Sequence, residues 1–558
     1  MEHRRYVLRF SLVFLALILC LLVFVVDLIL LQIFHSSHLA DLAAKQHRHT
    51  LEIEPVRGTI YDRKMRPLAF NVPIDSLFAN PKIMSESDKR EAVKHLSSLL
   101  NVHPHSLQQG LYKDKYFIWI KRKMPPDLVE KIKQLKINGL GFRKESKRYY
   151  PGGSLAAHLI GFASTDNEGL EGLELFYDHE LKGKPGRIRL LRDARQRGLS
   201  IENDVIPAKN GFHLVLTIDE TIQYIAEEAL EKAYQKYHAK AAVIIVMDTQ
   251  TGAILALANR PTYNLEDFPS SSIENRTNRA ISYVYEPGSV FKVVTTAAAL
   301  EDGGFHETDK IFCENGKYKI ANNILTDHRP HGTLTFTQVI GVSSNIGVVK
   351  IAQKLGPGTI YKYGRKLRFG TKTGVDLRGE VSGWLKSPPF WSKTSIGAIP
   401  IGYEVTTTAL QIVGMMSAVA NNGIYMRPFV LKYIKDNQDQ VIKAFEPLMV
   451  DQVITEETAR RVRDVLVYAV ENGTGTNAKI DGVTVAGKTG TARKVVNGRY
   501  SEGKYYATFA GFAPADRPRV AAVVVVDEPR PVYFGGSVAA PVFKEVIENT
   551  LKYLGSSE

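Results

Sequence analysis

The chain has 558 residues, of which 44% are hydrophobic and 23% charged, and a net charge of +14. These values are typical of a folded protein, exclude a disordered or collagen-like chain, and predict two to four domains. The positive charge favours contact with an anionic membrane or cell-wall polymer, although a soluble surface rich in lysine and arginine explains it equally well. We find no zinc-ligand spacing and no basic strip interleaved with aromatic residues, and therefore predict no nucleic-acid partner.

The N-terminal segment predicts a membrane anchor. Residues 10–26 carry no charge, and the apolar run resumes after Asp27 as far as Phe34. A helix of this length exceeds the ~30 Å hydrocarbon core of a bilayer. A cleavable signal peptide has a shorter apolar region followed by small residues, so an uncleaved anchor is favoured. Arg4, Arg5 and Arg9 predict a cytoplasmic N-terminus, with the rest of the chain outside.

This reading predicts a tail at residues 1–9, a transmembrane helix at 10–34 and a polar, histidine-rich juxtamembrane stalk at 35–50. Residues 51–210 form a mixed, turn-rich region with helical periodicity at 85–101 and 126–136. Its glycine-rich clusters contain few pairs of a nucleophile and a base. His158 has no nucleophile beside it and is predicted to be structural. We predict that 51–210 is a non-catalytic module.

Residues 211–558 predict an α+β domain. Asp219 can cap a helix running to about residue 237, and 241–247 and 253–258 form a β-hairpin. Three later strands are predicted at 483–486, 505–512 and 520–526, and the last is a valine–alanine run typical of a central strand. A helix-rich insert spans 330–470, and a final helix covers 541–554. Five strands in an antiparallel sheet with helices on both faces fit this order.

A buried helix with one charge is the first candidate for chemistry. Glu286-Pro287-Gly288 precedes an apolar helical run from Ser289 to Leu300 in which Lys292 is the only lysine. Residues at i and i+3 share a helix face, so the Ser289 hydroxyl and the Lys292 amine can meet. Burial lowers the pKa of a lysine, which suits a general base. A capping serine and a lysine whose amine reaches solvent are the alternative. A second S-x-x-K, Ser501 to Lys504, lies in a predicted loop.

Two further motifs strengthen the catalytic interpretation. Ser343-Ser344-Asn345 lies in a predicted loop of the helical insert, where a hydroxyl can relay a proton and an amide can hold a lysine or a substrate carbonyl. Lys488-Thr489-Gly490-Thr491 closes the predicted strand 483–486. There a lysine and hydroxyls can meet a substrate carboxylate, and Gly490 permits close backbone approach. A second Lys-Thr-Gly at 372–374 follows no strand and is predicted to be a turn.

In this order, S-x-x-K, S-x-N and K-T-G are the signature of penicillin-recognising serine enzymes. The chain resembles the class B penicillin-binding proteins, and among them the division-specific, septal peptidoglycan D,D-transpeptidases of the FtsI type. The likeness spans nearly the whole chain. It includes the basic N-terminus with its single span, and it continues through these segments: Arg57-Gly58, Asp62-Arg63, Arg148-Tyr149-Tyr150-Pro151, Ala157-His158, Gly161, Met247-Asp248, Thr251-Gly252 and Glu286-Pro287-Gly288-Ser289.

The resemblance implies a dimerisation-type pedestal at 51–210 and a transpeptidase domain at 211–558. It implies that Ser289 is acylated, that Lys292 activates it, and that Ser343 and Asn345 assist proton transfer and substrate positioning. Lys488, Thr489 and Thr491 would engage the terminal carboxylate of the substrate. The backbone N–H groups of Ser289 and Thr491 would form the oxyanion hole. No metal or cofactor is implied.

The implied reaction is acyl transfer between peptidoglycan stem peptides, with release of D-Ala from a D-Ala-D-Ala donor and attack by an amine of a neighbouring stem. β-Lactams would mimic the donor and acylate the enzyme. The implied partners are a membrane-embedded septal glycan polymerase and other division proteins. The implied location is the bacterial cytoplasmic (inner) membrane at the division septum, with the catalytic domain outside the cytoplasm.

Several alternatives stay open. A serine β-lactamase should be shorter and secreted, and no Glu-x-x-Leu-Asn segment follows Asn345. A membrane-bound β-lactam receptor would have several spans, and a D,D-carboxypeptidase usually has a C-terminal anchor. An elongation-specific class B transpeptidase is the nearest alternative, and a scaffold that recruits a septal glycan polymerase is another. Glu404 departs from the division type, which usually has a small residue at that position.

Overall fold

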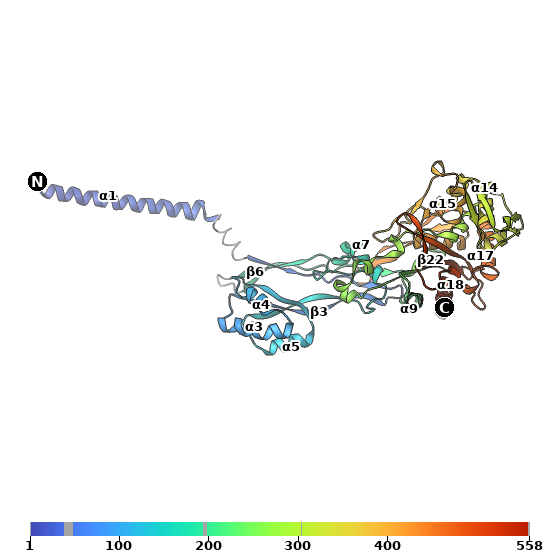
Figure 1. Cartoon of the computed structure of the whole chain (residues 1–558). Coiled ribbons are helices and arrows are strands. Elements are labelled where there is room, and N and C mark those ends of the chain that lie inside the picture. The colour runs from blue at the N-terminus through green and yellow to red at the C-terminus, as the bar shows by residue number, and fades with distance from the viewer. Residues whose placement is uncertain (1, 38, 40–47, 193–197, 303, 556–558) are drawn as a thin grey trace. The chain divides into compact units, whose positions relative to one another are not determined.

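The structure is a computed structural model that describes residues 2–37, 39, 48–192, 198–302 and 304–555 (Figure 1). The chain divides into two compact units. One comprises residues 1–56 and 183–210, and the other comprises residues 57–182 and 211–558.

The first unit contains a long apolar helix and a small sheet. Helix α1 (Glu2–Ile29) continues into the π-helical turn η1 (Leu30–Phe34). The helical stretch His3–Phe34 is long and apolar enough to cross a membrane, which agrees with the predicted helix at 10–34. Strands β1 (Arg48–Ile53), β6 (Gly186–Arg192) and β7 (Gly198–Ile206) pair antiparallel in the order β1-β6-β7. Residues 38 and 40–47 of the predicted stalk lie outside the described residues.

The second unit begins with a sheet of seven strands in the order β19-β18-β8-β2-β3-β4, with β5 also paired to β3. The strands are β2 (Ile60–Tyr61), β3 (Pro67–Ala79), β4 (Ile118–Met124), β5 (Leu140–Tyr149), β8 (His213–Leu216), β18 (Leu431–Lys435) and β19 (Val441–Ala444). Strand β8 pairs with β2 on one side and with β18, from beyond residue 430, on the other, so this sheet joins segments that are far apart in the sequence.

Three helices pack against one end of β3 and β5 (Figure 1). They are α3 (Glu86–Leu100), α4 (Pro104–Leu111) and α5 (Pro126–Gln134), which confirms the helices predicted at 85–101 and 126–136. Ser85 and Asp88 form a capping box that fixes the start of α3. Leucines of α3 and α4 bury themselves against Leu77 of β3, and this small core holds the helices on the sheet.

A buried network of ion pairs connects two motifs of the sequence, Arg57-Gly58 and the motif that begins at Arg148. Arg57 Nε donates to Glu174 Oε2 at 2.6 Å, and Arg148 Nε donates to Glu174 Oε1 at 2.7 Å. Arg148 also donates to the carbonyl of Gly58 at 2.7 Å. All three charged side chains are buried. These motif residues therefore have a structural role, because each buried charge has its partners. Short helices surround the network: α6 (Ala157–Ile160), α7 (Gly172–Phe176) and α8 (Asp178–Lys182).

His158 on α6 is buried, and its Nε2 lies 2.7 Å from the carbonyl of Asn275. Burial lowers the pKa of His158 to about 4, so the ring is neutral at pH 7. A neutral, buried imidazole bonded to backbone agrees with the structural role predicted for it.

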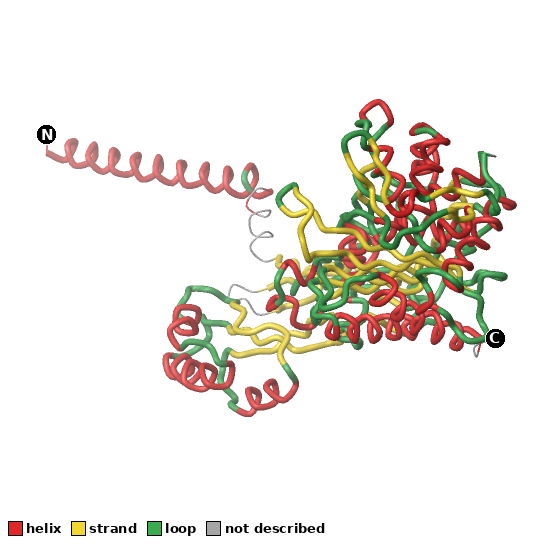
Figure 2. Tube along the Cα trace, turned by 45° about the vertical axis from the view of Figure 1, so that its right-hand side comes forward, coloured by secondary structure: helices red, strands yellow, loops and turns green. Residues whose placement is uncertain are grey.

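The predicted five-stranded antiparallel sheet is present in the order β10-β9-β23-β22-β21 (Figure 2). Its strands are β9 (Ala241–Asp248), β10 (Ile254–Arg260), β21 (Ala486–Val496), β22 (Arg499–Ala513) and β23 (Val520–Asp527). The valine-rich β23 is the central strand, as predicted. Helices α9 (Glu220–Lys236, capped by Asp219) and α18 (Gly535–Gly555) cover one face. Helices α12 (Lys292–Glu301) and α16 (Ala409–Ala420) cover the other.

Two boundaries predicted for this sheet are wrong. Residues 483–485 precede β21, which begins only at Ala486, so Lys488-Thr489-Gly490 lies within the strand and not at its end. The segment Ser501–Lys504, predicted as a loop, belongs to β22. Both differences have one cause, because β21 and β22 pair from Ala486–Phe512 out to Val496–Arg499 and form a hairpin longer than either hydrophobic run.

The segment between α12 and β21, which includes the predicted helix-rich insert, also contains short pairs of strands. Its helices are α13 (Phe336–Gly341), α14 (Asn345–Leu355), α15 (Pro357–Lys366), α16 and α17 (Glu456–Glu471). Its paired strands are β11 (Lys310–Phe312) with β14 (Thr333–Thr335), β12 (Lys317–Ile320) with β13 (Asn323–Thr326), β15 (Trp384–Leu385) with β16 (Val405–Thr406), and β17 (Ile424–Met426) with β20 (Met449–Gln452). This insert and β21 carry the residues of the site described next.

Candidate active site

Ser289 lies in a tight turn at the start of a buried helix. The turn is the 3₁₀ helix η3 (Gly288–Phe291), and it leads directly into α12. The single helix predicted from Ser289 to Leu300 is therefore 3₁₀ in its first turn. Residues at i and i+3 eclipse in a 3₁₀ helix, so Ser289 and Lys292 face the same side. Ser289 is half-buried, and its hydroxyl makes no hydrogen bond with the described residues.

The amine of Lys292 is fully buried and held by the Ser343–Asn345 turn. It donates to Ser343 O at 2.7 Å, to Asn345 Oδ1 at 2.8 Å and to Ser343 Oγ at 3.2 Å. Burial lowers the pKa of Lys292 well below its ordinary value, and the neighbouring charge of Lys488 lowers it further. The two predicted motifs thus meet at this amine, which is a candidate base.

Lys488 approaches the same turn from strand β21. Its amine is fully buried and donates to Ser343 Oγ at 3.0 Å and to the carbonyl of Thr489 at 3.2 Å. Burial lowers the pKa of Lys488 to about 7. The Ser343 hydroxyl therefore lies between two buried amines whose pKa values are both lowered, and it can pass a proton from one to the other.

Asp327, which the sequence analysis did not single out, fixes this turn. One carboxylate oxygen accepts the backbone N–H groups of Asn345 at 2.6 Å and Ile346 at 3.1 Å, and the other accepts Ser344 Oγ at 2.6 Å. The carboxylate caps the start of α14, where free N–H groups favour negative charge. Ser343 itself adopts a left-handed backbone with φ 63°. Asp327 lies after β13, and no local pattern in the sequence links it to this turn.

Glycines allow β21 to lie against the turn that carries Ser289. A Cβ atom at Gly490 would lie 2.9 Å from Pro287 O and 2.9 Å from Val290 Cγ2. A Cβ atom at Gly288, which has φ 53°, would lie 3.2 Å from the Cβ of Ala492. The close approach at Gly490 is thus to the protein's own turn, and contact with a substrate at this position stays a prediction. Packing here brings the predicted nucleophile and the lysine strand together.

The two threonines beside Lys488 have hydrogen-bonded hydroxyls. Thr489 Oγ1 lies 2.6 Å from Thr474 Oγ1, and Thr491 Oγ1 accepts the N–H of Gly535 at 3.0 Å. A hydroxyl that accepts one bond still has its own proton to donate. Thr491 can therefore donate to a substrate carboxylate, as expected for it, while Gly535 holds its side chain in place.

Glu404, the departure noted in the sequence, lies beside the turn of Ser289. Its backbone has φ 55°, a left-handed conformation that favours glycine, and its N–H donates to Glu286 Oε1 at 2.9 Å. Its carboxylate accepts Ser395 Oγ at 2.7 Å. The nearby Gly402 packs on Gly288 so closely that a Cβ atom would overlap its carbonyl. This loop therefore packs against the turn that carries Ser289.

A series of ring contacts connects β22 with the segment after Asp327. Tyr505 of β22 stacks on Tyr533 at 4.0 Å between ring centroids, and Tyr533 contacts Phe534 at 4.5 Å. Phe534 in turn lies 5.2 Å from His328, the neighbour of Asp327. Sequence reasoning missed these rings because they come from three separate segments.

The second copies of two motifs do not join the site in the same way. Lys372-Thr373-Gly374 lies outside every strand, and Glu380 accepts both the N–H and the hydroxyl of Thr373 at 2.6 Å. Ser501 and Lys504 lie on β22, in the stretch where its pairing with β21 shifts register, and they do not share a helical turn. The secondary structure around these second copies therefore distinguishes them from the motifs of the site.

Comparisons with known proteins agree with this fold. The model of the penicillin-binding protein transpeptidase domain matches residues 242–548, and that of the penicillin-binding protein dimerisation domain matches residues 52–216. The chain is similar to the probable peptidoglycan D,D-transpeptidase PenA of Neisseria meningitidis, at 36% identity over 91% of this chain and 86% of the relative. It is also similar to the peptidoglycan D,D-transpeptidase FtsI of Escherichia coli, at 32% identity over 99% of this chain and 93% of the relative.

Among solved structures, penicillin binding protein 3 from Mycobacterium tuberculosis in complex with aztreonam has a TM-score of 0.71 at 27% identity. The match covers 90% of this chain and 97% of that chain. Fold, site and family models together define a penicillin-binding protein with a transpeptidase domain. With its N-terminal dimerisation domain, the chain belongs to the class B penicillin-binding proteins.

Proposed function

We propose that this protein is a serine D,D-transpeptidase that cross-links peptidoglycan stem peptides through an acyl-enzyme on Ser289. Activity as a peptidoglycan D,D-transpeptidase follows from its family and from relatives with that name. The individual residue roles rest on the geometry. The observation that supports them best is the buried pair of amines, Lys292 and Lys488, on either side of the Ser343 hydroxyl.

The first half-reaction uses this pair. Ser289 Oγ attacks the carbonyl carbon of the D-Ala-D-Ala amide, and its proton passes to neutral Lys292. The proton then moves through Ser343 to the leaving nitrogen, the C–N bond breaks, and D-Ala departs. The backbone N–H groups of Ser289 and Thr491 stabilise the oxyanion. Lys488, Thr489 and Thr491 hold the terminal carboxylate of the donor.

In the second half-reaction, an amine of a neighbouring stem peptide attacks the ester on Ser289. The amine loses its proton to the same relay, the new amide forms, and Ser289 regains its hydrogen. A β-lactam enters as a donor analogue. Its amide bond opens, but the leaving nitrogen stays tethered, so the acyl-enzyme persists.

The test is covalent labelling of the full chain by a fluorescent penicillin. We expect labelling of the wild type and of Ser501→Ala, the serine of the second S-x-x-K, and none of Ser289→Ala. Labelling that survives in Ser289→Ala would exclude Ser289 as the nucleophile. Loss of labelling in Ser501→Ala would show that the assay reports folding instead of chemistry.

We further propose that the protein acts at the division septum with a septal glycan polymerase, anchored by its single N-terminal helix with the catalytic domain outside the cytoplasm. The full-length likeness to FtsI supports this role. Depletion should give filamentous cells, whereas round cells would indicate the elongation role. If cells with only Ser289→Ala divide normally, the main task is that of a scaffold.

A further inference from the structure

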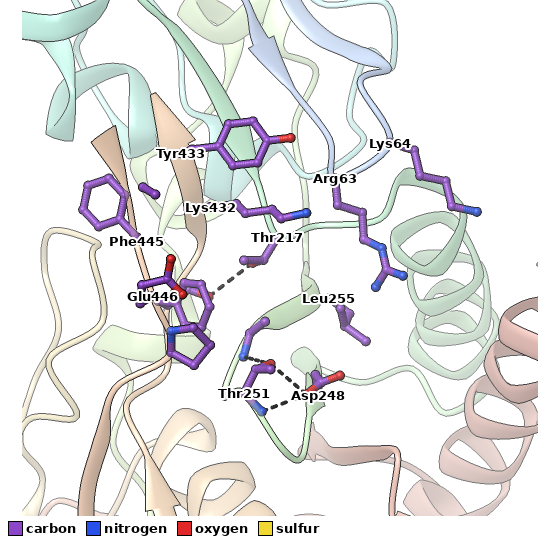
Figure 3. Close-up of a pocket in the computed structure, with 14 residues that line it drawn as sticks. Arg63, Lys64, Thr217, Asp248, Thr251, Leu255, Lys432, Tyr433, Phe445 and Glu446 are labelled. Carbon is purple, nitrogen blue, oxygen red and sulfur yellow. Dashed lines mark hydrogen bonds between the residues drawn. The ribbon is translucent and has the colours of Figure 1, made fainter. Parts of the chain in front are cut away.

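A cavity of about 490 Å³ lies away from Ser289, beside the hairpin turn between β9 and β10 (Figure 3). In the order of the five-stranded sheet, β9 and β10 are at the opposite edge from β21, which carries Lys488. The walls of the cavity come from the β9–β10 turn, from β18, from the segment after β19 and from the turn between β2 and β3. Its volume is in the range of sites that bind small organic ligands.

The walls combine apolar surface with positive charge. Leu255, Phe429 and Pro447 are among the apolar side chains that line the cavity. Lys432 and Arg63 line it from two different elements, and Figure 3 shows the Lys432 side chain directed toward the segment that carries Arg63. Apolar walls with a small number of charged groups are typical of a ligand site.

The positive charge is only partly balanced. Within the described part of the chain, Lys432 has no carboxylate within ion-pair distance, and its amine lies 5.4 Å from the Tyr433 ring centroid. Arg63 contacts Asp219 through Nε at 3.3 Å, which leaves its terminal nitrogens for other bonds. An anion placed between these two cations would gain charge-assisted hydrogen bonds.

The acidic groups of the cavity do not fill this role. Asp248 Oδ1 accepts the N–H and the hydroxyl of Thr251 at 2.8 and 2.7 Å, and the N–H of Gln250 at 3.1 Å. That carboxylate therefore stabilises its own turn. Glu446 is exposed at the rim, where water screens its charge.

From this geometry we infer that the cavity binds an organic carboxylate that carries an apolar group. The carboxylate lies between Lys432 and Arg63, and the apolar group packs on Leu255, Phe429 and Pro447. A peptide C-terminus that ends in an apolar residue and an alkyl carboxylate share this chemistry. The site is separate from the transpeptidase chemistry, so labelling of Ser289 by penicillin does not depend on it.

The test uses the full chain in nanodiscs of zwitterionic lipid, with binding measured by ligand-observed NMR. The probes are N-acetylphenylalanine, its amide and N-acetylglycine. We expect the aromatic acid to bind about tenfold more tightly than either the amide or the glycine acid, since each of those lacks one of the two interactions. Hexanoate separates the two sources: equal or tighter binding assigns the site to alkyl carboxylates, and weaker binding assigns it to peptide C-termini.

Lys432→Gln should weaken binding of N-acetylphenylalanine by about tenfold, and Glu446→Gln should strengthen it by about twofold. The matched control is Lys435→Gln, because Lys435 lies on the same strand, contacts Asp439 at 3.5 Å and does not line the cavity. Penicillin labelling of each variant checks its fold. Equal binding of the acid and the amide, or unchanged binding in a labelled Lys432→Gln protein, would overturn the inference.

Discussion

The carboxylate of Asp327 accepts the backbone N–H of Asn345 at 2.6 Å, and through this bond a residue with no chemistry of its own sets the position of the Lys292 amine. Asn345 can hold Lys292 only if its own backbone is fixed. Asp327 also balances part of the local positive charge, since it acts to raise the pKa of Lys292.

We therefore expect Asp327→Asn to slow acylation by a β-lactam about tenfold or more, because an amide oxygen accepts these N–H groups more weakly than a carboxylate. The measurement is the second-order rate of penicillin acylation with the melting temperature in parallel. Asp481→Asn, at an exposed position, is the control. An unchanged rate in a folded Asp327→Asn protein would contradict the positioning role.

The buried amine of Lys292 predicts the pH dependence of acylation. A base must be neutral to accept the Ser289 proton, so the rate should rise with pH through the lowered pKa of Lys292. In Lys292→Arg the guanidinium stays protonated, and the rate should fall by about 100-fold or more at every pH. Lys504→Arg should leave the profile unchanged. A Lys292→Arg enzyme with the pH profile of the wild type would show that another group is the base.

The buried amine of Lys488 should lower the unfolding free energy of the protein without bound substrate. Its pKa is about 7 in the folded protein, against an ordinary value of 10.5, so the unfolded chain binds more protons between these values. The stability of the wild type should therefore rise as pH increases from 7 to 10.5, and Lys488→Met lacks this component. At pH 7 we expect Lys488→Met to be more stable by about 2 kcal/mol, with weaker penicillin labelling.

Denaturation at pH 7 and at pH 10 measures this difference. The advantage of Lys488→Met should shrink at the higher pH, because the lysine is then neutral in the folded protein and pH 10 approaches its ordinary pKa of 10.5 in the unfolded chain. A constant difference would mean that packing, and not the buried charge, is responsible.

The Arg57–Glu174–Arg148 network predicts a large loss of stability on removing one charge. Glu174→Gln leaves two buried guanidinium groups short of a counter-charge, and we expect a loss of about 3–5 kcal/mol in unfolding free energy. Glu168→Gln removes an exposed pair with Lys182 and should cost less than about 1 kcal/mol. Denaturant unfolding of the two variants compares them directly. Equal costs would show that the network contributes no more than a surface pair.

The parts of the site that are predictable from sequence are those coded locally. Ser289 and Lys292 share one helical turn, and Ser343 and Asn345 share one loop, so their pairing follows from spacing alone. The residues that support them do not: Asp327 and Thr474 reach the site through tertiary contacts that leave no periodic signal. The start of β21 was misplaced for a related reason, since its length depends on pairing with β22 and not on its own hydrophobic run.

Strand β21, with Lys488 and its threonines, is the last strand of its sheet. A strand with a neighbour on one side only still has alternate backbone N–H and C=O groups to offer on the other. A stem peptide in extended conformation could use them as a sixth strand, with main-chain bonds setting its register and side chains contributing little. Recognition of this kind depends mainly on the main chain of the ligand and less on its side chains. In the proposed function, such recognition would let one site accept both a peptide and a fused-ring amide as the same donor.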